Sequence, residues 1–416
     1  MPSNETPKPQ LFTFAFTALC LFIFLAYCNV AVFYSLAIHL ERIGIPQQWR
    51  GLVIGASSLA TIACFLGASP FLTTRNAPGN IFLGIGLLMA CGVAYLDVSG
   101  VPGLLAVRLL NGAGVYLLSA SAMTLLVAGI PPSRSGQAFG LYSVAMLLPY
   151  CIIPSAFDWL SLRLPSLAWG YALMSLALLP AAGVNAVLAR RLRRQADAAP
   201  APAQAGTGHG DTSPAAGRFG FAEVFANLRR PSIGRLLLVN SVYYLSFSSL
   251  FFLAKGLFSD RGLENVGYFF SIQTLCMLGI RLFGNRLFDT VDKVLLVRVS
   301  YGLTAAGLLA MYCTGSHAVL YASALVLGLG MGIGSPSLNA LMFNLSAPRF
   351  KGVNSNLMMM SMHMGSFLGP ILGSAAVIVL GSGGFLLLGA AANAAGMLLS
   401  LPLKGGSAPG AQQPGG

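Results

Sequence analysis

Charged side chains are scarce in this chain of 416 residues. Asp, Glu, Lys and Arg together make up 8% of it, against roughly 25% in an ordinary soluble domain. Acidic residues are scarcer than basic ones: the chain has 11 Asp and Glu and 24 Lys and Arg, which gives a net charge of +13. Because 56% of the residues are hydrophobic, the composition excludes a soluble globular protein and indicates a membrane protein.

The motifs of several functional classes are also missing. The chain contains no Gly-x-x-x-x-Gly-Lys loop for nucleotide phosphates. Its seven cysteines show neither a disulfide framework nor the spacing of metal ligands. Paired acids, metal sets and nucleophiles with a neighbouring base are absent from its apolar runs. We therefore expect neither an enzyme nor a nucleotide-driven pump, and no cofactor or metal.

Apolar runs dominate what is present. A helix needs about 20 apolar residues to cross a bilayer, and twelve runs of that order occur. The predicted spans are 11–37, 50–71, 80–97, 102–129, 137–157, 167–189, 233–256, 265–286, 293–314, 317–345, 353–380 and 383–402. The predicted fold is an all-α membrane protein with twelve transmembrane helices.

The positive charges predict the orientation of the chain. An even number of spans places both termini on one side, and the loops on that side hold fifteen Lys and Arg. The loops on the other side hold four, Arg42, Arg50, Arg163 and Arg261. By the positive-inside rule the first side, with both termini, is cytoplasmic. The net charge then reflects topology, and we expect no nucleic-acid partner.

One segment interrupts the membrane pattern. From Arg190 to Arg230 the chain is rich in Ala, Pro and Gly and has basic clusters at both ends. This composition predicts a mostly disordered cytoplasmic linker, with a short helix at about 219–228. The expected division is a cytoplasmic tail (1–10), a six-helix bundle (11–189), the linker (190–232), a second six-helix bundle (233–402) and a disordered cytoplasmic tail (403–416).

The two halves contain matching segments. Residues 112–136 align without a gap with residues 328–352, an offset of 216, so that Gly112 meets Gly328 and Gly114 meets Gly330. Chance is the alternative, because small residues recur in packed membrane helices. The matched segments are nevertheless the fourth and tenth spans, as a duplication of six helices requires. Internal repeats with a site at their interface are typical of secondary transporters.

Short motifs add a family resemblance. The segment "RLLNGAG" at 108–114 is similar to an Arg-x-x-Gln-Gly-x-Gly signature on a fourth helix, with Asn111 at the Gln position. The segments 281–293 and 365–373 are similar to an eighth-to-ninth loop and an eleventh helix. Together with the span count and the central linker, they resemble the major facilitator superfamily.

This resemblance implies a transporter that rocks its two bundles about a central cavity. We expect proton-coupled export of a small organic molecule, such as a drug-like metabolite or a siderophore, by a monomer in the bilayer of a bacterial inner membrane. The exporter signature of the superfamily's fifth helix is degraded here, so export follows from general resemblance. The alternative is a proton-coupled importer of an organic anion, and a non-transporting receptor is a further possibility.

The superfamily's charged cytoplasmic loops are only half present. The loop between the second and third spans lacks an acid and keeps Arg75. The equivalent loop of the second half keeps Asp289 with Arg286 and Lys293. These four residues are the expected cytoplasmic gate, with its acid on one side only.

Arg108 is the most unusual residue of the spans. It lies roughly 9 Å below the outer surface at about 1.5 Å per residue. A charge at mid-membrane costs about 2.5 to 3.5 kcal/mol, and the partial depth of Arg108 lowers that cost. Either it snorkels to the headgroups, or it faces a cavity and holds an anionic substrate group. Asp158 lies at a similar depth, so an Arg108–Asp158 pair is a hypothesis, with an exposed loop acid as the alternative. His363 is a second titrating candidate, unless it only bonds a neighbouring helix.

Polar residues on the superfamily's usual cavity-lining helices would form the substrate site by resemblance. Their other interpretation is hydrogen bonding between helices, at about 0.6 kcal/mol each. They are Tyr27, Asn29, Asn240, Tyr243, Gln273 and Asn339.

Overall fold

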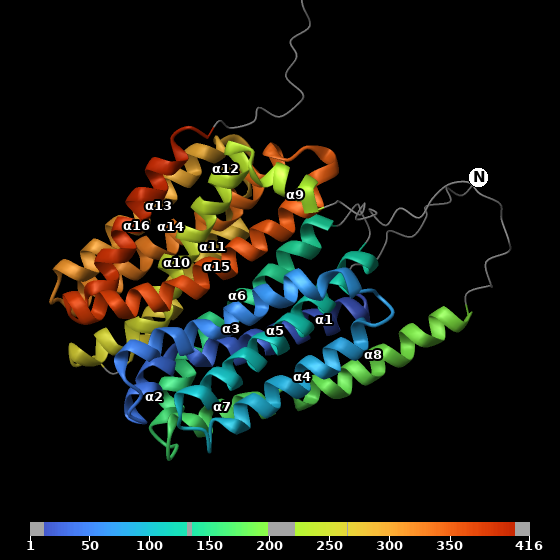
Figure 1. Cartoon of the computed structure of the whole chain (residues 1–416), viewed down its shortest axis with the longest axis horizontal. Helices are drawn as coiled ribbons and strands as arrows, with labels where there is room; N and C mark the ends of the chain where they lie inside the picture. Colours follow the sequence, from blue (N-terminus) through green and yellow to red (C-terminus); the bar gives the residue numbers. More distant parts are fainter. Residues whose placement is uncertain (1–11, 131–134, 199–220, 264, 404–416) are drawn as a thin grey trace, which may run out of the picture.

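The structure, a computed structural model, describes residues 12–130, 135–198, 221–263 and 265–403. Within these residues all regular structure is helical (Figure 1). Eleven helical segments are long and apolar enough to cross a membrane, and the apolar helix α16 (Gly384–Ser400) is shorter. The all-α membrane fold is therefore confirmed, whereas twelve crossings and cytoplasmic termini stay predictions.

The bounds of the remaining α-helices follow the predicted spans. They are α1 (Phe14–Ala31), α2 (Leu36–Arg42), α3 (Gln47–Gly67), α4 (Ala77–Ala94), α5 (Val101–Gly129), α6 (Ser135–Ser161), α7 (Leu167–Leu176), α8 (Leu179–Ala198), α9 (Phe221–Leu228), α10 (Pro231–Asp260), α11 (Val266–Phe283), α12 (Asn285–Thr290), α13 (Lys293–Cys313), α14 (His317–Leu345) and α15 (Lys351–Leu380). Short 3-10 turns are η1 (Val32–Ser35), η2 (Ser69–Phe71) and η4 (Pro348–Phe350).

The helices differ from the predicted spans mainly where polar residues continue them. The first segment runs through α1, η1 and α2 to Arg42, beyond the predicted end at residue 37. Helix α8 continues to Ala198, into the predicted linker, because Ala, Leu and Arg favour a helix even after the apolar pattern ends. The predicted short linker helix is α9. Residues 199–220 and the tails, apart from Leu403, lie outside the described residues.

The chain forms two groups of helices, an N-terminal group (α1–α8) and a C-terminal group (α10–α16), which lie side by side in Figure 1. The main contacts between them join α3 to α15 and α6 to α11. These contacts bring backbones together: a Cβ at Gly51 would be 2.5 Å from the Pro370 carbonyl oxygen, and one at Gly267 would be 2.4 Å from Ser155 Cα. Both contacts lie toward the end of the molecule predicted to face outward.

The offset of 216 residues also relates contacts in the structure. A Cβ at Gly112 would be 2.0 Å from the Ser57 carbonyl oxygen, and one at Gly328 would be 2.6 Å from the Gln273 carbonyl oxygen. Gln273 follows Ser57 by 216 positions. Gly114 meets the carbonyl oxygen of Gly84 and Gly330 that of Ser300, again 216 positions apart. The small residues of the two halves therefore perform the same packing, which chance similarity does not explain.

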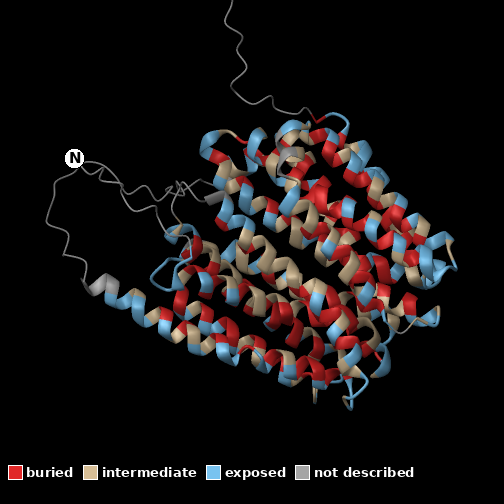
Figure 2. Ribbon diagram, turned by 180° about the vertical axis from the view of Figure 1, so that it is seen from behind, coloured by how far each residue is buried: buried red, intermediate tan, exposed pale blue. Residues whose placement is uncertain are grey.

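The surface of the helices is apolar over much of its extent. Large hydrophobic side chains such as Leu83, Leu179, Leu275 and Val379 are exposed, and exposed positions alternate with buried ones along the helices (Figure 2). In a bilayer such side chains contact lipid. The helices can lie in that apolar surrounding because their backbone polar groups are hydrogen-bonded within each helix.

Candidate functional site

A cavity of about 340 Å³ is lined by both groups of helices. Much of its wall is aromatic: Tyr27 of α1 contacts Tyr150 of α6, and Tyr150 contacts Phe251 of α10, with ring centroids 6.2 Å and 5.1 Å apart. Methionines and small hydroxyl side chains complete it. A mainly apolar cavity with a few polar groups is the usual form of a small-molecule site.

Arg108 contributes a buried guanidinium to this cavity. Its side chain on α5 is 2% exposed and donates from Nη2 to the Ile54 carbonyl oxygen, at 2.9 Å, and to Ser57 Oγ, at 2.6 Å, both on α3. The guanidinium carbon lies 4.9 Å from the centre of the Phe33 ring. Burial and these bonds exclude snorkelling as its role in this structure. Among the described residues, it pairs with no acid.

Arg281, near the end of α11, is a second cation of the same cavity. Its Nη1 donates to Ser143 Oγ on α6, and its Nε, like that of Arg108, has no hydrogen-bond partner. It also forms no ion pair with an acid in the described part of the chain. Within the described part of the chain, two guanidinium groups without a carboxylate partner therefore line one cavity.

Asp158 has a different partner from the one predicted. Its side chain is buried, so it is not a loop acid, and its Oδ1 lies 2.5 Å from Lys255 Nζ on α10. Tyr34 also donates to Oδ1, and the Gly267 backbone N–H donates to Oδ2 at 2.8 Å. The predicted Arg108–Asp158 pair is therefore wrong. Lys255 is the nearer cation because α10 and α6 both pack against η1 at this end of the molecule.

Comparison with known proteins identifies the fold. The sequence profile of the Major Facilitator Superfamily matches residues 19–370 and again residues 236–414. The chain belongs to the major facilitator superfamily. A crystal structure of the human organic anion transporter MFSD10 (TETRAN) is similar, with a TM-score of 0.62, 17% identity, and coverage of 94% of this chain and 100% of that one. No curated protein sequence matches.

Membership of the major facilitator superfamily makes this chain a transporter, and its fourth-helix signature occupies the cavity wall. Arg108, Asn111 and Gly112 all line the cavity. Asn111 Oδ1 accepts from Arg108 Nη1 at 3.4 Å. Gly112 allows α5 to approach α3 closely enough for Arg108 to reach the α3 backbone.

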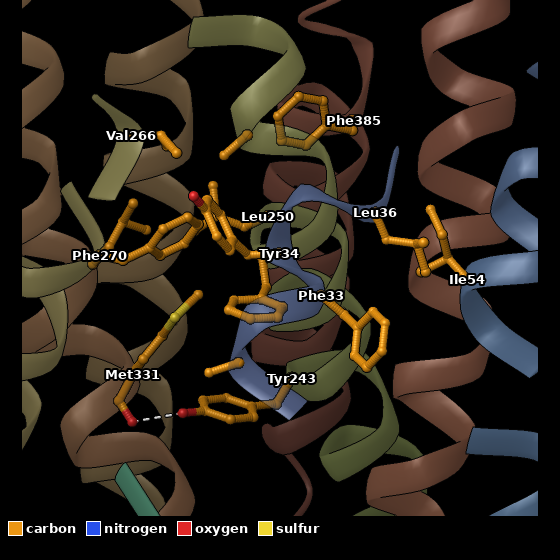
Figure 3. Packing of buried hydrophobic residues seen from close by; sticks show 14 of the residues in the cluster. Phe33, Tyr34, Leu36, Ile54, Tyr243, Leu250, Val266, Phe270, Met331 and Phe385 are labelled. Carbon is orange, nitrogen blue, oxygen red and sulfur yellow. Dashed lines mark hydrogen bonds between the residues drawn. The ribbon is translucent and has the colours of Figure 1, made fainter. Parts of the chain in front are cut away.

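The predicted polar residues divide into two sets in this superfamily member. Tyr27, Tyr243, Asn339 and His363 line the cavity, although Tyr243 also donates to the Met331 carbonyl oxygen at 2.6 Å (Figure 3). His363 lies against the Phe65 ring.

The other set joins helices and does not line the cavity. Asn29 donates to Ser175 Oγ at 2.6 Å, and Asn240 donates to Ser361 Oγ at 2.8 Å. Gln273 donates to Met331 Sδ at 3.1 Å. For these three residues the structure favours hydrogen bonding between helices.

The predicted cytoplasmic gate is only partly described. Arg75 is exposed in the loop before α4, and Lys293 begins α13. The side chains of Arg286 and Asp289 lie outside the described part. In the first-half loop, which lacks an acid, Thr73 and Asn76 bond each other's backbone N–H groups instead. The gate itself stays a prediction.

Lys255 and Arg281 are not among the residues predicted from the sequence. Each is a charge within a predicted span, 233–256 and 265–286, which is the same signal that drew attention to Arg108. Their positions near the ends of those spans resemble ordinary headgroup contacts, so only the structure separates them from snorkelling cations.

Proposed function

We propose that this superfamily member is a proton-coupled secondary active transporter that exports small organic anions. The observation that supports an anionic substrate is that two guanidinium groups, the buried Arg108 and the partly buried Arg281, line one cavity without a carboxylate partner among the described residues.

A buried cation is expensive unless an anion accompanies it. Arg108 is held in place by a carbonyl and a hydroxyl oxygen, which orient the guanidinium but leave its charge without a counter-ion among the residues that the structure describes. The same holds for Arg281, whose described partner is a serine hydroxyl. An anionic substrate supplies the missing charge, and a planar guanidinium suits carboxylate, sulfonate or phosphonate oxygens.

The rest of the cavity suits an apolar or aromatic body. Tyr150, Phe247 and Phe251 present ring faces and edges to it, and aromatic pairs favour such arrangements. A volume of about 340 Å³ lies within the range of small-molecule sites, roughly 300 to 1,000 Å³. The substrate class is therefore an amphipathic organic anion. It agrees with the organic anions in the name of the structural neighbour.

We propose export and proton coupling from the resemblance of the chain to efflux members of the superfamily. We assign the binding and release of the transported proton to the Asp158 carboxylate. We place the protein in a bacterial inner membrane as a monomer, with both termini in the cytoplasm, which is the orientation that the loop charges favour.

The test uses inverted membrane vesicles with an acidified lumen and a collapsed membrane potential. Aromatic sulfonates are added outside, each beside its neutral sulfonamide, because a sulfonate stays charged and does not cross as a free acid. We expect the sulfonates, and not the sulfonamides, to discharge the pH gradient. We expect Arg108→Ala to abolish this discharge and Arg163→Ala to retain it. Arg163 is an exposed loop residue stacked on Trp159, so it is a matched control.

Two outcomes contradict the proposal. Discharge by neutral or cationic compounds, with the sulfonates inactive, overturns the anionic substrate class. Sulfonate movement that requires an inward proton gradient in right-side-out vesicles overturns export and favours the proton-coupled importer of organic anions.

A further inference from the structure

The Asp158 carboxylate joins the two groups of helices. It is carried by α6 of the N-terminal group, whereas Lys255 and Gly267 belong to α10 and α11 of the C-terminal group. The bonds to these residues measure 2.5 Å and 2.8 Å. Separation of the two groups at this end must break both of them.

The carboxylate lies where backbones already touch. A Cβ at Gly267 would be 2.4 Å from Ser155 Cα, and the hydroxyl oxygens of Ser155 and Ser271 are 2.7 Å apart across the same junction. The predicted outer end is therefore closed in this structure. The Asp158–Lys255 pair is the charged part of that closure.

Lys255 also lies next to the substrate cavity. Ser248, Phe251 and Phe252 of α10 line the cavity, and Lys255 follows them by seven, four and three positions, which places it on the same helix face. The side chain of Lys255 is 13% exposed. The ammonium group thus lies about one helical turn beyond the cavity wall.

Aromatic rings connect the wall of the cavity to the ion pair. Phe251 contacts Phe270 with ring centroids 5.5 Å apart. Phe270 contacts Tyr34, with ring centroids 6.2 Å apart (Figure 3). Tyr34 in turn donates to Asp158 and accepts from Lys255. The cavity wall is therefore connected to the ion pair through a series of contacting aromatic rings.

We infer that Lys255 exchanges partners during transport: Asp158 holds it in the empty transporter, and the anionic group of the substrate replaces Asp158 in the loaded one. The inference rests on the proposed function, because it needs an anionic substrate. No covalent bond changes, since one oxyanion replaces another at the ammonium group. Exchanging partners costs less than leaving a buried ammonium with none, and the released Asp158 carboxylate is hydrated once the two groups of helices separate at this end.

The exchange links loading to opening. While Asp158 keeps Lys255, the predicted outer end is held by a charged contact between the two groups, so an empty transporter stays closed there. Once the substrate takes Lys255, that contact is lost and the groups can separate on the side to which the substrate must leave.

The test measures closure directly in the purified full-length protein. Ser155→Cys and Ser271→Cys are introduced after the seven native cysteines are replaced by alanine, and the rate of disulfide formation under an added oxidant reports contact of α6 with α11. The probe is naphthalene-2-sulfonate, with the neutral sulfonamide as its control. We expect saturating sulfonate to slow cross-linking by about fivefold or more, and the sulfonamide to leave the rate unchanged.

Two variants identify the residues responsible. Lys255→Met, built into the same cysteine pair, should cross-link slowly without sulfonate and show no further change with it. Asp158→Asn should bind the sulfonate several-fold more tightly than the parent, because Lys255 has lost its competitor. Arg163→Met, in an exposed loop, should behave as the parent does.

The possible failures are separable. If fluorescence titration shows that the parent binds the sulfonate but its cross-linking rate does not change, the partner exchange is overturned and the anionic substrate stands. If the parent binds no sulfonate, the proposed function fails first. The effect of sulfonate on the parent needs no change at Lys255 or Asp158, so poor folding of those variants cannot mimic either result.

Discussion

Gly112 on α5 lies against the backbone of α3, so closely that a Cβ would be 2.0 Å from the Ser57 carbonyl oxygen. The contact sets the distance between the helix that carries Arg108 and the helix whose Ile54 and Ser57 oxygens hold it. A packing residue, Gly112, therefore determines the geometry of Arg108, the residue to which we assign the anionic group of the substrate.

Gly112→Ala should destabilise the protein, because the obstructing atom is a backbone oxygen that cannot rotate away. Overpacking of this kind costs about 1 to 3 kcal/mol, and the melting temperature of the detergent-purified protein measures it. Gly86→Ala on α4, where nothing lies within 4 Å of the added Cβ, is the control and should be neutral or stabilising by about 0.5 to 1 kcal/mol. Equal melting temperatures for the two variants would contradict the packing argument.

Arg108→Lys should weaken transport although the charge is kept. The guanidinium donates from one nitrogen to two α3 oxygens, which leaves its other N–H groups for a ligand. A lysine ammonium is a compact point charge without this planar fork, so it cannot serve both sets of oxygens in the same geometry. We expect the half-saturating sulfonate concentration to rise by about tenfold, equivalent to about 1.4 kcal/mol. Initial rates in inverted vesicles measure it, and an unchanged value would mean that charge alone suffices.

The Asp158–Lys255 pair should show strong coupling in a double-mutant cycle. Lys255→Met leaves a buried carboxylate without its cation, which costs about 3 to 5 kcal/mol, whereas replacing both members of a buried pair is often nearly neutral. Asp158→Asn/Lys255→Met should therefore melt closer to the parent than Lys255→Met does. Additive losses in the double variant would show that the two side chains do not depend on one another.

Asp158→Asn should separate anion movement from proton movement. Asn cannot bind or release a proton, so the sulfonate should still exchange across the membrane but no longer discharge the pH gradient. The titratable or charged groups near Asp158 and its partner Lys255 are Tyr34, Tyr321 and Arg42. The Asp158→Asn substitution leaves these three groups and Lys255 in place. Tracer exchange beside a pH-sensitive dye distinguishes the two movements. Retained discharge would transfer the proton to another group, with His363 the first to test.

The orientation can be read from single cysteines in a background without the native ones. Leu162, after α6, is 76% exposed, and Phe225, on α9, is 56% exposed. In intact cells a membrane-impermeant thiol reagent should label Leu162→Cys and not Phe225→Cys, and inverted vesicles should give the reverse. The opposite pattern would place both termini outside.

Several features of this protein could be predicted because they depend on local chemistry. Hydropathy identified the helical segments, since each must satisfy its own backbone in the bilayer, and small residues at an offset of 216 predicted equivalent packing of Gly112 and Gly328. The helix ends were less well predicted. The apolar pattern ends with the bilayer, whereas α8 continues through basic residues to Ala198.

The sequence by itself determined that this chain is a helical membrane protein with a repeated half, and that Arg108 is exceptional. Only the tertiary structure decided which charges meet. Lys255 reaches Asp158 across 97 positions, and Arg108 reaches Ser57 across 51, while Asn240 and Gln273 turn to neighbouring helices and not to the cavity. Such pairings depend on how each helix is rotated about its axis and packed against the others. The residue pattern of a single segment does not determine which residues of another helix it will meet.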